Sequence, residues 1–327
     1  MKREDFFAQL FSNLDGLSAE ERSKIEEYYT ELLMDELEEG VPEEEAISHF
    51  GNPGEVAGRI KDEHEVKDDM KERLPVNTGP IRRDGVYQAK GEITSFQISA
   101  QDVSVQIYPA LDGKFKILYR KSPKEEVSVW EDQGQYIFRQ EIPLRYRIFS
   151  FGKWGREGIR VEVPENKIRN FQVTTSNATV KAENLRGFED GRLYTSNARI
   201  TLQNIEGNRV ETKSSNGGIH LELCKTKQLD AQTSNSGIFC GESSSQRVFL
   251  KTSNGRIHIR RLISEDIKLR NSNASIKGSI CGDVRTYAMD CHTSNGSCNL
   301  PNWKDVQCTN HLYAHTSNAS IKIDFTD

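Results

Sequence analysis

The chain has 327 residues, enough for two domains with separate hydrophobic cores. Its formal net charge of -5 hides an asymmetry: residues 1–74 hold 9 Lys/Arg against 22 Asp/Glu (net -13), and the remainder holds 35 against 27 (net +8). The first residues lack the apolar run of a secretory signal, and no window resembles a transmembrane helix. Six cysteines without framework spacing indicate reduced thiols. We therefore expect a cytoplasmic chain without a transmembrane segment.

Residues 1–66 carry the pattern of short amphipathic helices. Apolar residues recur three and four positions apart in the first of these stripes, at Phe6, Phe7, Leu10, Phe11 and Leu14. Glycines and prolines between successive stripes are typical of helix ends and starts. The sequence predicts a compact four-helix domain at 1–66, followed by a charged linker at 67–81.

The stretch "MDELEEGVPEEE" makes this domain strongly acidic. Such a run is either a solvated helix surface or a docking face for a basic partner. The succession "GLSAEER", "YY" and "GNP" resembles the HAAS signalling domain, a small bacterial helical module found beside PadR-like repressors and ahead of membrane sensors. The resemblance implies a protein partner, such as a PadR-like regulator or a membrane sensor.

Beyond residue 81 the apolar residues alternate with polar ones, as is typical of strands. A Ser-Asn pair then recurs at intervals of 20, 19, 19, 19, 19, 22 and 23 residues. These intervals separate Asn177, Asn197, Asn216, Asn235, Asn254, Asn273, Asn295 and Asn318. A period near twenty with two short strands per repeat indicates a β-solenoid, in which each repeat forms one coil.

Aligning the repeats on the Ser-Asn pair predicts which positions face the interior. An apolar residue stands three positions after each Asn and, except at Gly191, six positions before it, and a small residue stands one position after it. Asparagine tolerates turn geometry, and stacked coils bring equivalent residues about 4.8 Å apart. We therefore expect the asparagines to form a hydrogen-bonded corner ladder, and the neighbouring hydroxyl column to do the same.

The predicted fold is mainly β, with a parallel β-solenoid of about eight coils of 19–23 residues. Irregular strands precede the coils within a domain at 82–327, and the small all-α domain lies at the amino end. The Ser-Asn repeats and the "GIRVEVPE" element resemble the toast-rack family of candidate adhesins, a bacterial β-solenoid domain of unknown function. The resemblance covers residues 82–327 and implies the same fold.

One basic segment, "RYRIFSFGKWGR", interleaves cations with aromatic rings. It could contact a phosphate backbone or a membrane surface, or it could be a hairpin whose rings cover the first coils. The candidate contact patch consists of Arg145, Arg147, Phe149, Phe151, Lys153, Trp154 and Arg156.

Two further groups bear on chemistry. The first comprises Cys291, His292, Cys298, Cys308, His311 and His315, whose spacing fits no zinc knuckle, so we expect no metal and no cofactor. The second is the expected outward column Lys181, Thr201, His220, Phe239, His258 and Lys277, which lacks stacked carboxylates beside a base. We therefore expect no catalytic residues.

The sequence thus predicts a non-enzymatic interaction and signalling scaffold, with no specific nucleic-acid site. The helical domain would dock a regulatory partner, and the solenoid would provide a rigid binding or assembly surface. The alternatives are a carbohydrate-binding or surface adhesin solenoid and a carbohydrate-active β-helix enzyme. Because the final stretch "TSNASIKIDFTD" is still patterned like an interior coil, we also expect a homo-oligomer through the C-terminal coil.

Overall fold

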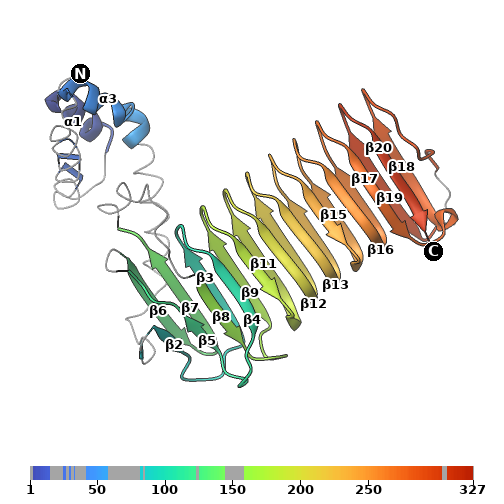
Figure 1. Cartoon of the computed structure of the whole chain (residues 1–327), viewed down its shortest axis with the longest axis horizontal. Helices are drawn as coiled ribbons and strands as arrows, with labels where there is room; N and C mark the ends of the chain where they lie inside the picture. Colours follow the sequence, from blue (N-terminus) through green and yellow to red (C-terminus); the bar gives the residue numbers. More distant parts are fainter. Residues whose placement is uncertain are drawn as a thin grey trace. The chain divides into compact units, whose positions relative to one another are not determined.

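The computed structural model describes residues 3–14, 25–26, 29–30, 33, 42–57, 82–83, 85–122, 125–143, 158–303 and 308–326. The chain divides into two compact units, Met1–Val76 and Asn77–Asp327. The first is helical and the second is built from strands (Figure 1).

The helical unit is held together by aromatic side chains. Its helices include α1 (Arg3–Ser12) and α3 (Glu43–His49), with a further helical turn at 53–57. The ring of Phe6 lies 5.5 Å from Tyr29 and 5.4 Å from Phe50, centroid to centroid. Four residues of the predicted stripe are buried, with Phe6 and Leu10 almost fully enclosed, and Phe11 is partly buried against them. Among the described residues, no helix has the length and apolar character needed to cross a bilayer.

The second unit contains strands β1 to β20. The amino-terminal group is β1 (Arg82–Arg83), β2 (Val86–Gln88), β3 (Ser95–Ala100), β4 (Val105–Pro109), β5 (Lys116–Leu118), β6 (Glu126–Asp132), β7 (Gln135–Glu141) and β8 (Ile159–Val163). The repeats follow as β9 (Asn170–Thr175), β10 (Val180–Glu183), β11 (Arg186–Thr195), β12 (Ile200–Ser214), β13 (Ile219–Gln232), β14 (Ile238–Gly241), β15 (Ser244–Lys251), β16 (Ile257–Arg270) and β17 (Ile276–Cys281). The last group is the short helix η1 (Val284–Thr286), β18 (Tyr287–Thr293), β19 (Asn310–Thr316) and β20 (Ile321–Thr326).

Two parallel sheets face each other across the solenoid. The pre-corner sheet contains the segments that lead into each Ser-Asn corner: β9, β11, the second halves of β12, β13 and β16, β15, β18 and β19. The post-corner sheet contains the segments that follow it: β10, the first halves of β12, β13 and β16, β14, β17 and β20. The predicted parallel β-solenoid is therefore confirmed.

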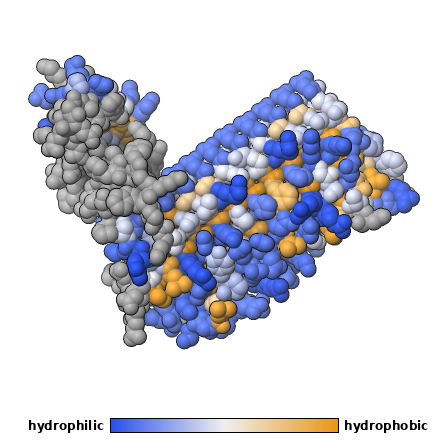
Figure 2. Space-filling model, in the orientation of Figure 1, coloured by the Kyte–Doolittle hydropathy of each residue, from blue (hydrophilic) through white to orange (hydrophobic). Residues whose placement is uncertain are grey.

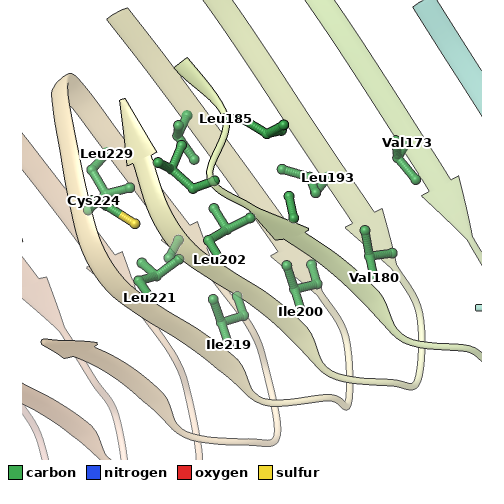
Figure 3. Close-up of a cluster of buried hydrophobic side chains, with 14 of the residues drawn as sticks. Val173, Val180, Leu185, Leu193, Ile200, Leu202, Ile219, Leu221, Cys224 and Leu229 are labelled. Carbon is green, nitrogen blue, oxygen red and sulfur yellow. The ribbon is translucent and has the colours of Figure 1, made fainter. Parts of the chain in front are cut away.

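The core fills the space between these sheets. Side chains such as Ile200, Leu202 and Leu221 point toward Leu193 and Leu229 of the opposite sheet (Figure 3). The predicted columns three after and six before the asparagines are buried, except that Cys298 is only partly enclosed. The interior is thus one continuous apolar cluster that runs from coil to coil.

A second corner lies seven residues after each of five consecutive asparagines. The backbone there has a positive φ, between 44° and 57°, at Asn184, Asn204, Leu223, Glu242 and Arg261. Four residue types therefore share one left-handed backbone conformation, which non-glycine residues seldom adopt. This corner lets β12, β13 and β16 pass from one sheet into the other.

The amino end departs from simple chain order. Strand β3 lies between β7 and β9, and β4 lies between β8 and β10, all in parallel pairing. The region expected to be irregular therefore contributes further coils. Antiparallel strands β6 and β5 then pair with β7 and β8, respectively, and close this end.

The carboxyl end is also out of chain order, which corrects an expectation. Strands β19 and β20 pair directly with β16 and β17, and β18 lies outside β19. The coil around Asn318 therefore separates the coils around Asn273 and Asn295. The first of the last two intervals is longer because its connection must pass the coil around Asn318, a distance of about 10 Å. The second is longer because it holds the segment that pairs with Met289 of β18 before the chain returns to β19.

Strand β19 is thus interior in the pre-corner sheet, whereas β20 is the last strand of the post-corner sheet, and among the described residues only 297–299 bond to its outer side. The homo-oligomer contact expected through the C-terminal coil stays a prediction. The outermost strand of the pre-corner sheet is β18, and a returning segment covers part of its edge. Met289 exchanges two backbone hydrogen bonds with Trp303, of 2.6 and 3.0 Å, and Asn302 accepts one from the Cys291 amide. This cover reduces the unpaired backbone that β18 could offer to another strand.

Candidate binding surface along the Ser-Asn corners

The corner asparagines are joined side chain to side chain. Each Nδ2 donates to the Oδ1 of the next asparagine toward the amino end, at 2.5 to 2.9 Å. The amino-terminal acceptor is Asp102, whose carboxylate accepts from Asn177 at 2.5 Å. Figure 2 shows a regular hydrophilic border along one long edge of the solenoid, as stacked polar corners produce. These side chains are exposed, so the ladder forms part of the surface.

The hydroxyl column beside the ladder behaves differently from the expectation. Its members donate to backbone carbonyls of the neighbouring corner instead of bonding to each other. Thr233 reaches the Gly217 carbonyl at 2.9 Å, and Thr252 reaches the Ser236 carbonyl at 2.8 Å. Asn271 takes this position in one coil and donates to the Gly255 carbonyl at 2.6 Å. Because these groups are buried, each bond satisfies a carbonyl that would otherwise lack a partner.

The residue after each asparagine is small chiefly because the backbones of neighbouring corners stack closely there, and only secondarily because the position is buried. A Cβ atom added at Gly217 would lie 1.6 Å from the Ala198 carbonyl oxygen. At Gly255 it would lie 1.9 Å from the Ser236 carbonyl. This column is therefore restricted by contact between corners, although most of its residues are only partly buried.

A groove of about 470 Å³ runs beside the corners on the pre-corner sheet. It crosses several coils, because its lining repeats the same three columns. The outward column contributes Thr174, Tyr194, Lys213, Gln232 and Lys251; the hydroxyl column contributes Thr175, Thr195, Ser214 and Thr233; and the corner column contributes Ser196, Ser215, Ser234 and Ser253. The groove thus offers hydroxyls, an amide, a phenol ring and two ammonium groups along the solenoid axis.

An ion-pair network supports the floor beside this groove. Glu211 is only 8% exposed, pairs with Lys213, and accepts from Arg209 at 2.9 Å. Burial opposes ionisation of Glu211, but the hydrogen bond from Lys213 and nearby positive charge outweigh it and lower its pKa. Burial raises the pKa of neighbouring Asp230, although Gln228 donates to it at 2.7 Å. Lys213 is therefore held in place at the groove by a carboxylate beneath it.

The groove lining contains no carboxylate and no histidine. The pKa of Tyr194 is raised by burial and that of Lys213 by the hydrogen bond to Glu211, so both side chains of the lining stay protonated at neutral pH and supply hydrogen bonds and charge. This chemistry suits binding of an extended ligand across coils.

The opposite face holds a group that the sequence analysis missed. The expected outward column is in register on the post-corner sheet, where His220 stacks on Phe239 at 4.6 Å and Phe239 meets His258 edge-on at 5.4 Å. Glu222 lies 3.6 Å from His220 and 2.5 Å from Arg260. The spacing of its members could have predicted this group, because residues 220 and 222 are two apart on a strand and their side chains therefore lie on the same face of the sheet.

The remaining sequence-selected groups are placed as follows. Cys291 points into the core while His292 lies on the outward face, stacked on His315 at 5.7 Å. Among the described residues, no group of three or more His, Cys, Asp or Glu side chains could hold a metal ion. The basic aromatic patch at 145–156 lies outside the described residues.

Comparison with known proteins places this architecture in a family. The family model Toastrack DUF4097 matches residues 93–326, and the HAAS model matches residues 5–59. No curated protein matches the chain.

Two solved structures are similar over most of the second unit. A candidate cell adhesion protein from Clostridium sporogenes has 10% identity and a TM-score of 0.24, with 74% of this chain and 98% of that chain covered. A candidate adhesin from Bacteroides fragilis has 12% identity and a TM-score of 0.38, with 76% and 99% covered. The family assignment rests on the sequence models: the chain belongs to the Toastrack DUF4097 family and carries a HAAS domain at its amino-terminal end.

Proposed function

We propose that the protein is a non-enzymatic binding scaffold. Its solenoid presents a rigid surface, and its helical unit docks a regulatory protein. The observation that carries the proposal is the groove beside the corner ladder, whose lining repeats with the strand spacing over consecutive coils. The Asn–Asn bonds and the Thr-to-carbonyl bonds fix neighbouring corners relative to each other, which supports a preorganised surface.

The partner of the groove is proposed to be an extended protein segment lying across the coils. Hydroxyls and the Gln232 amide can bond peptide groups, while Lys213 and Lys251 favour acidic side chains. Peptide and glycan arrays probed with the purified full chain test this. The double variant Tyr194→Ala/Gln232→Ala should lose peptide binding, whereas Thr201→Ala on the post-corner sheet should retain it.

The array also separates the alternatives. Binding to neutral glycans alone, lost in the same double variant, would favour the carbohydrate-binding adhesin. Release of shortened or modified ligand, including new reducing ends from polysaccharides, would contradict a non-enzymatic role. Equal binding by wild type and both variants would place the interface outside the groove.

The helical unit is proposed to bind a PadR-like regulator or a membrane sensor through its acidic surface. The first turn of α3 supports this with Glu43, Glu44 and Glu45, none of which is buried. Replacing all three with Gln in the full chain should weaken binding to a purified candidate regulator. Unchanged affinity would remove this face from the proposed interface.

We also propose that the chain acts in the cytoplasm. All six cysteines are free thiols, and burial raises the pKa of Cys240 and Cys291 to about 12, which disfavours the reactive thiolate. Cell fractionation with a tagged full-length chain tests this location. Recovery at the cell surface would contradict it.

A further inference from the structure

The carboxyl-terminal half of the pre-corner sheet carries cations held against aromatic rings. Phe249, Lys268 and Tyr313 occupy equivalent positions on three neighbouring strands. The Lys268 ammonium lies 5.9 Å from the Phe249 ring centroid and 5.7 Å from that of Tyr313. Arg270 also lies over Tyr313, at 5.3 Å. These contacts hold the cations in a regular array on the sheet.

These cations differ from those nearer the amino end of the same sheet. There, Arg192 pairs with Asp190 at 2.6 Å and Arg209 pairs with Glu211 at 2.9 Å. Among the described residues, Lys251, Lys268 and Arg270 take part in no ion pair. Their charge is therefore available to a partner.

We call this surface the basic face and define it by Arg247, Lys251, Lys268 and Arg270 with the rings of Phe249 and Tyr313. Asp230, Asp266 and Asp290 lie beside it, in register with Phe249, His311 and Tyr313. Four permanent cations against three carboxylates leave the basic face positive. The whole chain has a net charge of -5, but residues 75–327 carry +8, and the basic face places four of these cations on one sheet surface.

The geometry favours a flat partner over a strand of nucleic acid. Single-stranded nucleic acid binds aromatic platforms by stacking bases on open ring faces. Here Lys268 lies over both rings and Arg270 over Tyr313. Apart from Lys251, which is shared with the corner groove, the cations lie outside the groove lining. They are spread over the face of a sheet, at the spacing of its strands.

We propose that the basic face binds the anionic surface of a lipid bilayer. A bilayer presents negative headgroups in a plane, so it can meet several cations of a sheet face at once without matching their spacing. The half-buried Phe249 and Tyr313 rings and the long stems of Lys268 and Arg270 suit the headgroup region, where apolar and polar surfaces meet. The bilayer contact is made by a folded surface and needs no membrane-spanning segment.

Vesicle co-sedimentation of the full chain tests this proposal. The chain should pellet with vesicles of equal parts phosphatidylglycerol and phosphatidylcholine at low salt and remain in solution with phosphatidylcholine alone. The double variant Lys268→Gln/Arg270→Gln should lower the partition coefficient by roughly 30-fold, since each cation near such a surface contributes about 1 kcal/mol. Raising the salt should release the wild type.

The matched control is Lys277→Gln/Lys322→Gln, which removes the same charge from neighbouring coils of the post-corner sheet. It should change the partition coefficient by less than about threefold, because screening weakens distant charges. Equal melting temperatures of the two double variants would show that both are folded.

Three results would overturn the proposal. The wild type could fail to bind anionic vesicles at low salt, or the control could lose binding as much as the basic-face variant. Alternatively, single-stranded DNA or an acidic polysaccharide could bind through the basic face while vesicles do not, which would assign it to a soluble polyanion.

Discussion

The side chain of Asn318 donates a 2.8 Å hydrogen bond to Asn273, which lies 45 residues earlier in the chain. The intervening corner residue, Asn295, bonds to the outer side of Asn318 at 2.9 Å. The ladder therefore follows spatial order and not chain order. Strand β19 becomes interior as a result, and the basic face, which includes Tyr313 of β19, depends on this arrangement.

The ladder predicts an unequal cost for two equivalent substitutions. Asn318→Ala removes two ladder bonds, whereas Asn295→Ala removes one, because Asn295 is the last member. A hydrogen bond contributes about 0.5–1.5 kcal/mol, and the exposed position places these near the lower value. Urea unfolding should show the larger loss for Asn318→Ala. A larger loss for Asn295→Ala would indicate stacking in chain order.

The core predicts opposite outcomes for adjacent residues of β16. Ile257 is fully buried and His258 lies on the outward face. Ile257→Asp should cost more than about 4 kcal/mol, since it removes apolar packing and buries an unpaired carboxylate. His258→Asp should change stability by less than about 1 kcal/mol. Circular dichroism melts of both variants decide the point, and similar melting temperatures would refute the assignment of the two faces.

The corner backbone predicts a sharp contrast between two neighbouring glycines. A Cβ at Gly217 would overlap the Ala198 carbonyl at 1.6 Å, whereas one at Gly218 would meet its nearest atom at 3.4 Å. Gly217→Ala should therefore cost about 1–3 kcal/mol by forcing the corners apart. Gly218→Ala should be neutral or slightly stabilising. Calorimetry that finds equal melting temperatures for the two variants would contradict this close stacking.

The ion network predicts opposite pH effects at two carboxylates. The raised pKa of Asp230 means that ionisation costs more in the folded chain, so its contribution to stability is present at low pH and is lost as pH rises through the folded pKa. Asp230→Asn should be more stable than wild type at neutral pH, by a margin that shrinks below pH 3.8.

Glu211 is the matched comparison for this pH effect. Its lowered pKa stabilises the fold above its ordinary value of 4.5, and this contribution is lost as pH falls through the folded pKa. Glu211→Gln should therefore be less stable than wild type at neutral pH and approach it in acid. Thermal melts across this range check both variants, and shifts of the same sign at neutral pH would contradict the network.

The repeating interior could be predicted because stacking forces equivalent positions into equivalent environments. Once Asn197 and Asn216 are aligned, the burial of Ile200 and Ile219 follows. The second corner could not be predicted in this way. Asn184 and Asn204 bond to each other at 2.6 Å, but Leu223, Glu242 and Arg261 adopt the same backbone conformation without a common side-chain chemistry.

The sequence contains one sign that the last two coils exchange places, but this sign can be interpreted only once the structure is known. The intervals of 22 and 23 residues exceed the usual 19, but extra residues in a solenoid normally form surface loops. The groove could not be predicted from the sequence either. Its lining combines outward-facing residues of the strands with hydroxyl residues at the corners. Only the register of the strands places Lys213 between Tyr194 and Gln232.

The most direct test of the stacking order is a pair of engineered cysteine cross-links. Lys268 and Tyr313 are register partners, whereas Asp290 lies one strand further out. With Cys281, Cys298 and Cys308 replaced by Ser, oxidation should form a disulfide in Lys268→Cys/Tyr313→Cys. It should form none in Lys268→Cys/Asp290→Cys, whose Cα atoms are about 10 Å apart, beyond disulfide reach. The reverse result, with efficient cross-linking only between positions 268 and 290, would show that the coils stack in chain order and would contradict the account.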